Sequence, residues 1–369
     1  MSSQSASAKG QRRWRAMMWS LLAIIALAIA LPSMGYLAAH ASAVYGPDRD
    51  FAEDRATNPR SDMWRDARVG EGGFTTQTGP YVTNTMISNV GENWRQIRTG
   101  PMVTYGGWAL VVVLALISLF FVINGRVKIE GGRSGMTVVR WKAYERFLHW
   151  FTALSFIVLA ITGLSLLFGR YVLIPVFGHS GFAAYAQLAY NVHNAVGPAF
   201  SVGVLAMIVL WVKHNIPNKT DLQWFKQGGG IIGGKHPSAG KMNGGEKVWF
   251  WGGVFTLGLV VIISGSILLF PNLGFQTREI MAWSQVVHAI ASLVWIALFF
   301  GHAYIGTAGT EGALEGMTRG RVDTNWAKQH HDLWYEDLMA KGEKPVSEEE
   351  LRRQKQGLPP AGAAGQPGH

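Results

Sequence analysis

The sequence predicts an all-α integral membrane protein, and three observations point to that fold class. Charged residues make up only 15% of the 369 residues, well below the roughly 25% of soluble domains. Apolar segments recur along the chain, and most have the length that crosses a bilayer as a helix, about 18–25 residues. The loops that join these segments alternate between many and few basic residues. The apolar segments lie at residues 17–39, 103–124, 147–168, 189–212, 249–270 and 284–306.

The loop charges predict how the segments are oriented. Residues 125–146 and 213–248 each carry six lysines or arginines, and the chain is basic again at 319–328. The loops at 169–188 and 271–283 each carry a single arginine and no lysine, Arg170 and Arg278 respectively. Positively charged loops stay on the cytoplasmic side, so we expect the two basic loops and the C-terminus to be cytoplasmic. The net charge of +10 therefore indicates membrane orientation rather than nucleic-acid binding.

Residues 1–43 are expected to form a signal peptide or an N-terminal membrane anchor. Three arginines at positions 12, 13 and 15 precede the first apolar segment, and Ala41-Ser42-Ala43 has the form of a cleavage site. The apolar run is long for a signal peptide, so it would also suffice to span a membrane. In both cases the chain that follows is exported.

The remainder divides into four predicted regions. Residues 44–100 are polar and are expected outside the cytoplasm, either as a loosely structured loop or as a strap that docks on a partner subunit. Residues 101–137 are expected to form one extra transmembrane helix and a cytoplasmic loop. The four-helix transmembrane bundle is predicted at 138–312, and a cytoplasmic tail at 313–369.

Four histidines lie within three of the last four apolar segments: His149, His193, His288 and His302. An ionisable side chain in a membrane span is costly and usually has a function. His288 and His302 are fourteen residues apart on one predicted helix, so they face the same side and lie about 21 Å apart along its axis. That helix offers one nitrogen ligand near each face of a bilayer.

Depth in the membrane predicts how the histidines pair. The loop charges place His149 and His302 at the cytoplasmic ends of their helices, and His193 and His288 near the extracytoplasmic ends. Two pairs at two depths predict two stacked b-type haems with bis-histidine ligation. Small residues near the four ligands leave room for a porphyrin or for close helix packing: Gly163, Gly197, Gly265 and Gly301.

The chain contains no cysteine. This excludes covalent haem c, iron–sulfur clusters and a cysteine nucleophile within it, so an iron–sulfur relay to the haems would need a partner subunit. Six further histidines lie in predicted loops or the tail, and we expect them to be solvated: His179, His214, His236, His330, His331 and His369. Residues 326–338 in the tail are expected to form an amphipathic helix at the membrane interface.

Several motifs in order along residues 138–338 resemble one family, the cytochrome b (gamma) subunit of membrane-bound respiratory formate dehydrogenase. They are YERFLHW, AYNVHNAVG, HNIPNKTD, GKMNGGEK, VVHAIAS, GHAYIG and WAKQHHDLWYEDL. The resemblance implies four transmembrane helices that bind two b haems through His149 with His302 and His193 with His288. It also implies a quinone site beside the cytoplasmic haem, at Asn243, Gly245 and His302. The extension at 1–137 departs from the family pattern.

The resemblance further implies an electron-transfer subunit of a formate:quinone oxidoreductase in a bacterial inner membrane. Its partners would be an iron–sulfur (beta) subunit and a catalytic molybdenum or tungsten (alpha) subunit, and its substrate menaquinone or ubiquinone. Two other hypotheses stay open at this point. The chain would serve a hydrogenase or another molybdo-enzyme as its cytochrome b, or it would be a non-redox transporter or scaffold with histidines as proton relays.

Overall fold

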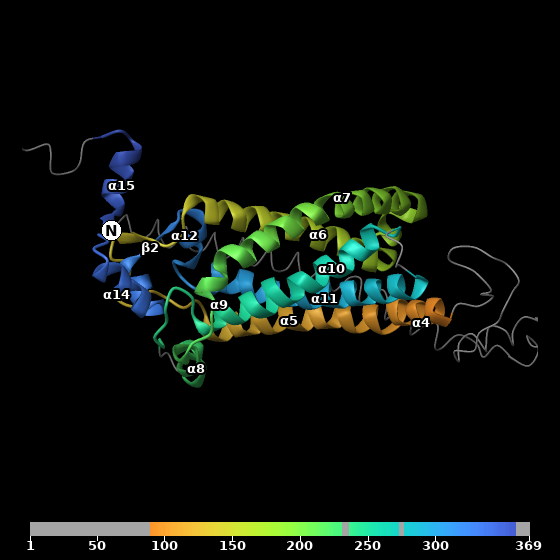
Figure 1. Cartoon of the computed structure of the whole chain (residues 1–369), viewed down its shortest axis with the longest axis horizontal. Coiled ribbons are helices and arrows are strands. Elements are labelled where there is room, and N and C mark those ends of the chain that lie inside the picture. Colours follow the sequence, from red (N-terminus) through yellow and green to blue (C-terminus); the bar gives the residue numbers. More distant parts are fainter. Residues whose placement is uncertain (1–88, 231–235, 273–276, 359–369) are drawn as a thin grey trace, which may run out of the picture. The chain divides into compact units, whose positions relative to one another are not determined.

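The computed structural model describes residues 89–230, 236–272 and 277–358 and is almost entirely helical (Figure 1). Within these residues, five helices are long and apolar enough to cross a membrane, which confirms a multi-pass, all-α membrane fold. The predicted segment at 17–39, all of residues 1–43 and most of 44–100 lie outside the described residues. The five candidate spans are Val90–Asn124, Ala143–Val172, Ile174–His214, Gly244–Leu269 and Arg278–Gly309.

The helices that make up the spans follow the apolar pattern, with one difference. The predicted loop at 169–188 is mostly helical, because α6 runs to Val172 and α7 begins at Ile174, with a kink at Gly178. The span helices are α4 (Asn89–Ile97), α5 (Val103–Asn124), α6 (Ala143–Val172), α7 (Ile174–Trp211), α9 (Gly244–Val248), α10 (Gly258–Leu269) and α11 (Arg278–Tyr304), with π-helical turns at Arg98–Met102, Trp249–Leu257 and Ile305–Gly309.

The chain forms two compact units, and each long helix contributes to both. Among the described residues, the first unit comprises 89–116, Ser155–Ala199 and Leu257–Ala297; the second comprises Ile117–Leu154, Phe200–Thr256 and 298–358. Within the first unit, α5 and α11 pack closely: a Cβ on Gly106 would stand 2.6 Å from Leu293 Cδ1. Glycine at that position therefore lets the extra helix approach α11.

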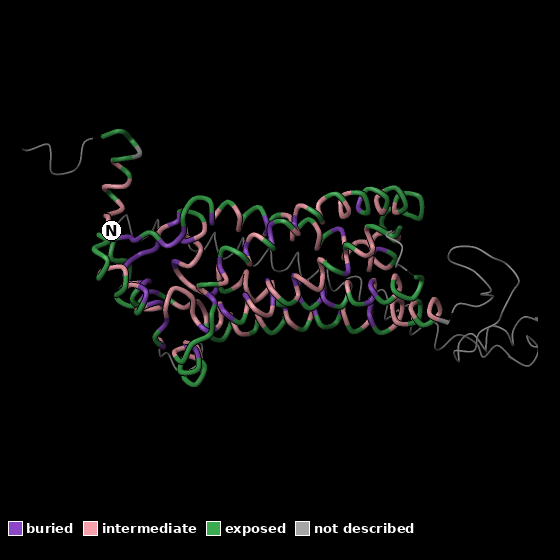
Figure 2. The backbone as a smooth tube through the Cα atoms, viewed as in Figure 1, coloured by how far each residue is buried: buried purple, intermediate pink, exposed green. Residues whose placement is uncertain are grey.

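Exposed residues recur along the helices (Figure 2), and many of them are large hydrophobic residues. On α5, Leu116, Leu119 and Val122 are 59%, 55% and 66% exposed. Such a surface is unfavourable in water and suits the hydrocarbon region of a bilayer.

The second unit also contains a small subdomain that the sequence did not predict. It consists of residues 127–142 and 310–358, and its sheet has the strand order β2–β1–β3. The central β1 (Met136–Val139) pairs antiparallel with β2 (Arg321–Asp323) and β3 (Val346–Ser347). Its helices are α12 (Ala313–Thr318), α13 (Thr324–His330), α14 (Asp332–Ala340) and α15 (Glu348–Lys355), and its buried core is Ile129, Val138, Val322, Trp326, Ala327 and Trp334.

The subdomain corrects two expectations for the tail. Residues 326–338 form α13 and α14 rather than one amphipathic helix, because His331 between them adopts φ −150° and ψ 52°. His331 is also not solvated: it is 1% exposed. His214, His236 and His330 are partly buried as well, whereas His179 is exposed as expected and His369 lies outside the described residues.

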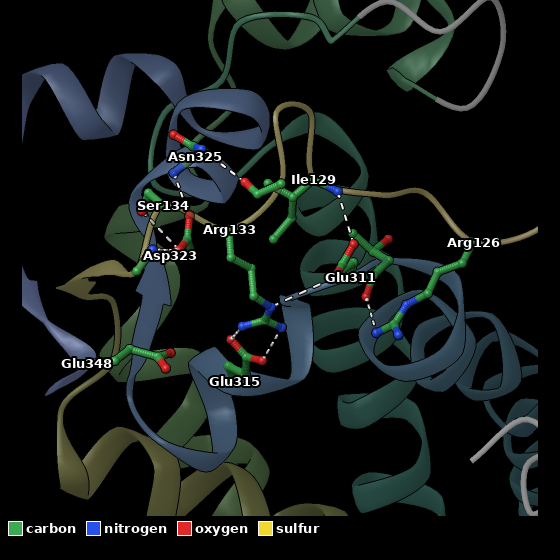
Figure 3. Close-up of polar contacts among 12 residues, drawn as sticks. Arg126, Ile129, Arg133, Ser134, Glu311, Glu315, Asp323, Asn325 and Glu348 are labelled. Atoms are coloured by element: carbon green, nitrogen blue, oxygen red, sulfur yellow. Dashed lines mark hydrogen bonds and ion pairs between the residues drawn. The ribbon is translucent and has the colours of Figure 1, made fainter. Parts of the chain in front are cut away.

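Ion pairs join the loop after α5 to the chain after α11 (Figure 3). Arg133 forms two hydrogen bonds with the Glu315 carboxylate, at 3.0 and 2.6 Å. The Ile129 amide donates to Glu311 at 3.3 Å, and Asn325 donates to the Gly132 carbonyl at 3.0 Å. This part of the N-terminal extension is therefore an integral part of the second unit.

Candidate haem and quinone sites

The structure brings the four predicted histidines together as two pairs, one in each unit. In the second unit, the ring centroids of His149 on α6 and His302 on α11 lie 6.2 Å apart. In the first unit, those of His193 on α7 and His288 on α11 also lie 6.2 Å apart. These are the partners that loop charge and helix spacing predict.

The separation matches what a shared iron requires. An imidazole nitrogen binds a metal at about 2.0–2.1 Å and lies roughly 1 Å from the ring centre. Two imidazoles on opposite sides of one iron therefore hold their ring centroids roughly 6 Å apart. Both observed separations have this value, so each pair fits the ligand set of a bis-histidine haem.

In the first unit, hydroxyl groups fix which imidazole nitrogen is free. His193 Nδ1 lies 2.8 Å from Thr162 Oγ1, and His288 Nδ1 lies 3.1 Å from Ser264 Oγ and 3.2 Å from the Val261 carbonyl. Hydrogen bonding at Nδ1 leaves Nε2 of both rings available for iron, and orients the rings as metal-bound histidines usually are. Sequence analysis missed Thr162 and Ser264, although each lies one residue before a glycine singled out for its size.

Replacing these hydroxyls should alter the metal site without removing a ligand. We expect Thr162→Val and Ser264→Ala to shift the midpoint potential of the haem at His193 and His288 and to lower its retention. Loss of a hydrogen bond to a metal-binding histidine commonly lowers metal affinity about 10–100-fold. Redox titration followed by optical spectroscopy measures both effects. Thr152→Val on the same helix as Thr162 is the matched control, since the Thr152 hydroxyl donates to the Leu148 carbonyl and has no histidine partner among the described residues; an equal shift there would contradict the assignment.

The glycines near the ligands differ in what they accommodate. A Cβ on Gly163 would lie 3.4 Å from His193 Cε1, and one on Gly265 would lie 3.0 Å from His288 Cε1. Those two glycines make room for the imidazoles. A Cβ on Gly197 or Gly301 would meet no atom within 4 Å, so these positions border open space beside His193 and His302.

In the second unit an aromatic ring orients the ligand. Trp249, in the turn that follows α9, stacks on His302 with ring centroids 4.5 Å apart and planes at 7°. His149 Nδ1 is buried and has no hydrogen-bond partner among the described residues. The two histidine pairs therefore differ in their surroundings: hydroxyls hold one pair, and an aromatic ring holds one member of the other.

Two of the three predicted quinone residues, Asn243 and Gly245, lie at the start of α9, and the third, His302, is on α11. Asn243 is the N-cap: its Oδ1 accepts from the Glu246 amide at 2.9 Å, while the Asn243 amide donates to Glu246 Oε2 at 2.8 Å. This capping box uses the Asn243 oxygen. The described residues give its Nδ2 no acceptor, so a hydrogen-bond donor is left over.

Gly245 has a packing role that its sequence position did not reveal. A Cβ there would lie 3.0 Å from the Trp224 ring, and one on Gly244 would lie 2.9 Å from the same ring. Trp224 belongs to α8 (Lys219–Lys226), which a buried ion pair between Lys247 Nζ and Asp221 (2.8 Å) holds against α9. Beside Gly245 opens a cleft of about 370 Å³, lined by Trp224, Phe225, Gly228, Gly229, Gly245 and Val248.

A buried polar cluster, also missed from sequence, adjoins the Asn243 turn. Arg140, at the end of β1, is 5% exposed, and burial lowers the pKa of its guanidinium. Its Nη2 lies 3.0 Å from His331 Nε2 and 3.2 Å from Glu246 Oε1. Burial, and next the Arg140 charge, hold the pKa of His331 well below its usual value, so the His331 ring is neutral and its Nε2 accepts from Arg140.

Comparison with known proteins identifies the family. The model of the family described as prokaryotic cytochrome b561 matches residues 140–320. The nitrate-inducible formate dehydrogenase cytochrome b556 subunit of Escherichia coli K12 is 30% identical over 217 residues, which cover 58% of this chain and 96% of that protein. The chain belongs to the family of formate dehydrogenase cytochrome b subunits.

Two further members of this family are similar to the chain over most of their own length. A second Escherichia coli K12 formate dehydrogenase cytochrome b556 subunit is 29% identical over 211 residues, or 56% of this chain and 96% of its own length. The Haemophilus influenzae subunit is 25% identical over 223 residues, or 58% and 89%. Family membership implies haem b and electron transport, and disfavours the transporter hypothesis. The family model begins at residue 140, just after the N-terminal extension.

Proposed function

We propose that this chain is the electron-transfer subunit of a formate:quinone oxidoreductase and holds two b haems. His193 and His288 would hold one haem, and His149 and His302 the other. The observation that carries the proposal is the 6.2 Å separation of the ring centroids in both pairs. Haem iron supplies one-electron redox chemistry, and the chain sets the potential through ligand identity, hydrogen bonding and burial.

The quinone is proposed to bind beside Gly245, near the haem held by His149 and His302. The cleft at Gly245 has aromatic and glycine walls and a volume of about 370 Å³, within the usual range for small-molecule sites. Asn243 supplies the amide donor that a reduced quinone carbonyl needs, and Trp249 links the same helix to His302 through ring stacking. Family resemblance and these contacts together support this location.

The proposed partners follow from the family and from the absence of cysteine. A catalytic molybdenum or tungsten subunit would oxidise formate outside the cytoplasm, and an iron–sulfur subunit would pass electrons to this chain in the inner membrane. Moving one electron inward against the membrane potential costs about 2.3 kcal/mol per 100 mV. A donor and acceptor of sufficiently different potential cover this cost, so the arrangement conserves energy.

Haem content tests the proposal. The complex isolated from its own membranes should contain two non-covalent b haems per copy of this chain, reducible by formate and reoxidised by quinone. A pyridine haemochrome assay after acid–acetone extraction measures the stoichiometry, and subunit identification in the same sample tests the partners. One haem per chain, or haem that resists extraction, would contradict the proposed ligand sets.

A further inference from the structure

The segment 239–246, which leads into α9, is held by the subdomain at several points. The Ala239 amide donates to Asp332 Oδ1 at 2.8 Å, and His331 Nδ1 lies 2.8 Å from the Gly240 carbonyl. Arg140 Nη2 donates to the Lys241 carbonyl at 3.1 Å. Every one of these partners belongs to the subdomain of residues 127–142 and 310–358 and not to a membrane span.

Arg140 reaches the Asn243 turn through Glu246. One carboxylate oxygen of Glu246 accepts from Arg140 at 3.2 Å, and the other accepts from the Asn243 amide at 2.8 Å. Asn243 in turn accepts from the Glu246 amide. A displaced Arg140 would therefore release the carboxylate that closes the capping box and would free the Asn243 side chain to rotate.

The guanidinium itself has little freedom to move. Its Cζ lies 5.6, 5.1 and 5.2 Å from the ring centroids of Trp141, Trp326 and Trp334, distances at which cations attract aromatic faces. The His331 hydrogen bonds are consistent with one tautomer, in which Nδ1–H donates to Gly240 and Nε2 accepts from Arg140. Tryptophans and histidine thus orient the cation toward the 239–246 segment.

We infer that Arg140, oriented by His331, is a positioning residue that holds the Asn243 amide toward the quinone. The inference rests on the proposed function, because it needs a quinone at Asn243. The unpredicted subdomain then has a defined role, since it fixes the loop that carries the hydrogen-bond donor. Lysine is a poor substitute for arginine here, because its ammonium lacks the planar guanidinium that lies among the Trp141, Trp326 and Trp334 rings and carries Nη2 to the loop.

The test compares Arg140→Lys and His331→Phe with Arg321→Gln. Arg321 is the matched control, because it bonds Thr137 within the same sheet and, among the described residues, has no hydrogen bond or ion pair to 239–246. In the isolated complex we expect Arg140→Lys and His331→Phe to retain two haems. Amide hydrogen exchange in residues 239–246 should become about tenfold faster, and the quinone KM should rise about tenfold with a smaller change in kcat. His331→Gln, which keeps a donor and an acceptor, should return the exchange rate and the quinone KM most of the way to their values in the unmodified complex.

The two readouts separate the possible failures. Unchanged exchange in 239–246 would overturn the inference and leave the quinone proposal standing. Faster exchange with unchanged quinone kinetics would overturn both the inference and the proposed quinone site, because the loop would then move without affecting the reaction. If Arg140→Lys does not assemble, Glu246→Gln replaces one of the two acceptor oxygens with an NH2 group, so it cannot accept from both Arg140 and the Asn243 amide. It should give the same pair of changes, and normal exchange and kinetics in it would overturn the inference as well.

Discussion

Replacing His193 with alanine should remove one haem from the complex and leave the other in place. Each imidazole supplies one of two axial ligands, and a cavity with a single remaining histidine binds haem less tightly. The two pairs belong to separate compact units, so the loss should not spread. His288→Ala should give the same spectrum as His193→Ala, because both side chains belong to one pair.

His149→Ala and His302→Ala should remove the other spectral component. Pyridine haemochrome assays should fall from two haems per chain to one in all four variants, and low-temperature optical spectra should show which component is lost. His179→Ala is the control, because His179 is an exposed histidine near the start of α7. Loss of the same component in His193→Ala and His149→Ala would show that the pairing is wrong.

The histidine pairs were predictable because helical geometry and membrane charge rules act over short, regular stretches. Fourteen residues on one helix place His288 and His302 on the same side, and loop charge assigns the depth of His149 and His193. The structure brings together the same partners. The spans were predictable for a similar reason, since a continuous apolar run is a strong signal.

The subdomain was not predictable because its contacts are far apart in the sequence. Val138 pairs with Val322 across a separation of more than 180 residues, and each strand has four residues or fewer. Strands that short carry almost no alternating pattern. The charged tail therefore resembled a solvated segment, and the burial of Arg140 and His331 was missed along with the sheet.

Gly245 illustrates how a correct location can have more than one cause. Family resemblance implies a role in quinone binding, whereas the structure shows that Trp224 packs on its backbone. The packing would favour glycine even without a ligand, because a Cβ at 3.0 Å would require the Trp224 ring to shift. Asn243 is the more informative position, because only its oxygen is used in the fold: the oxygen caps α9, and the side-chain nitrogen has no acceptor among the described residues.

Replacing Asn243 with aspartate should separate these two roles. Aspartate keeps the oxygen that caps α9 and is as good an N-cap as asparagine, but it loses the Nδ2 donor. Both haems should stay bound and reducible by formate, while their reoxidation by quinone should slow by about tenfold or more, as expected for the loss of a hydrogen bond to developing negative charge. Asn243→Leu should slow reoxidation at least as much and also weaken the cap, at a cost of about 1 kcal/mol.

Asn218 provides the matched control for this substitution. It caps α8 with the same box, because its Oδ1 accepts from the Asp221 amide at 3.1 Å and its own amide donates to Asp221 at 2.7 Å. Asn218→Asp therefore makes the same chemical change in the same type of turn. Stopped-flow reoxidation of the haems by a short-chain quinone should slow in Asn243→Asp and stay normal in Asn218→Asp. Equal rates in the two variants would mean that the quinone does not bind the Asn243 amide, and that Asn243 serves only to begin α9.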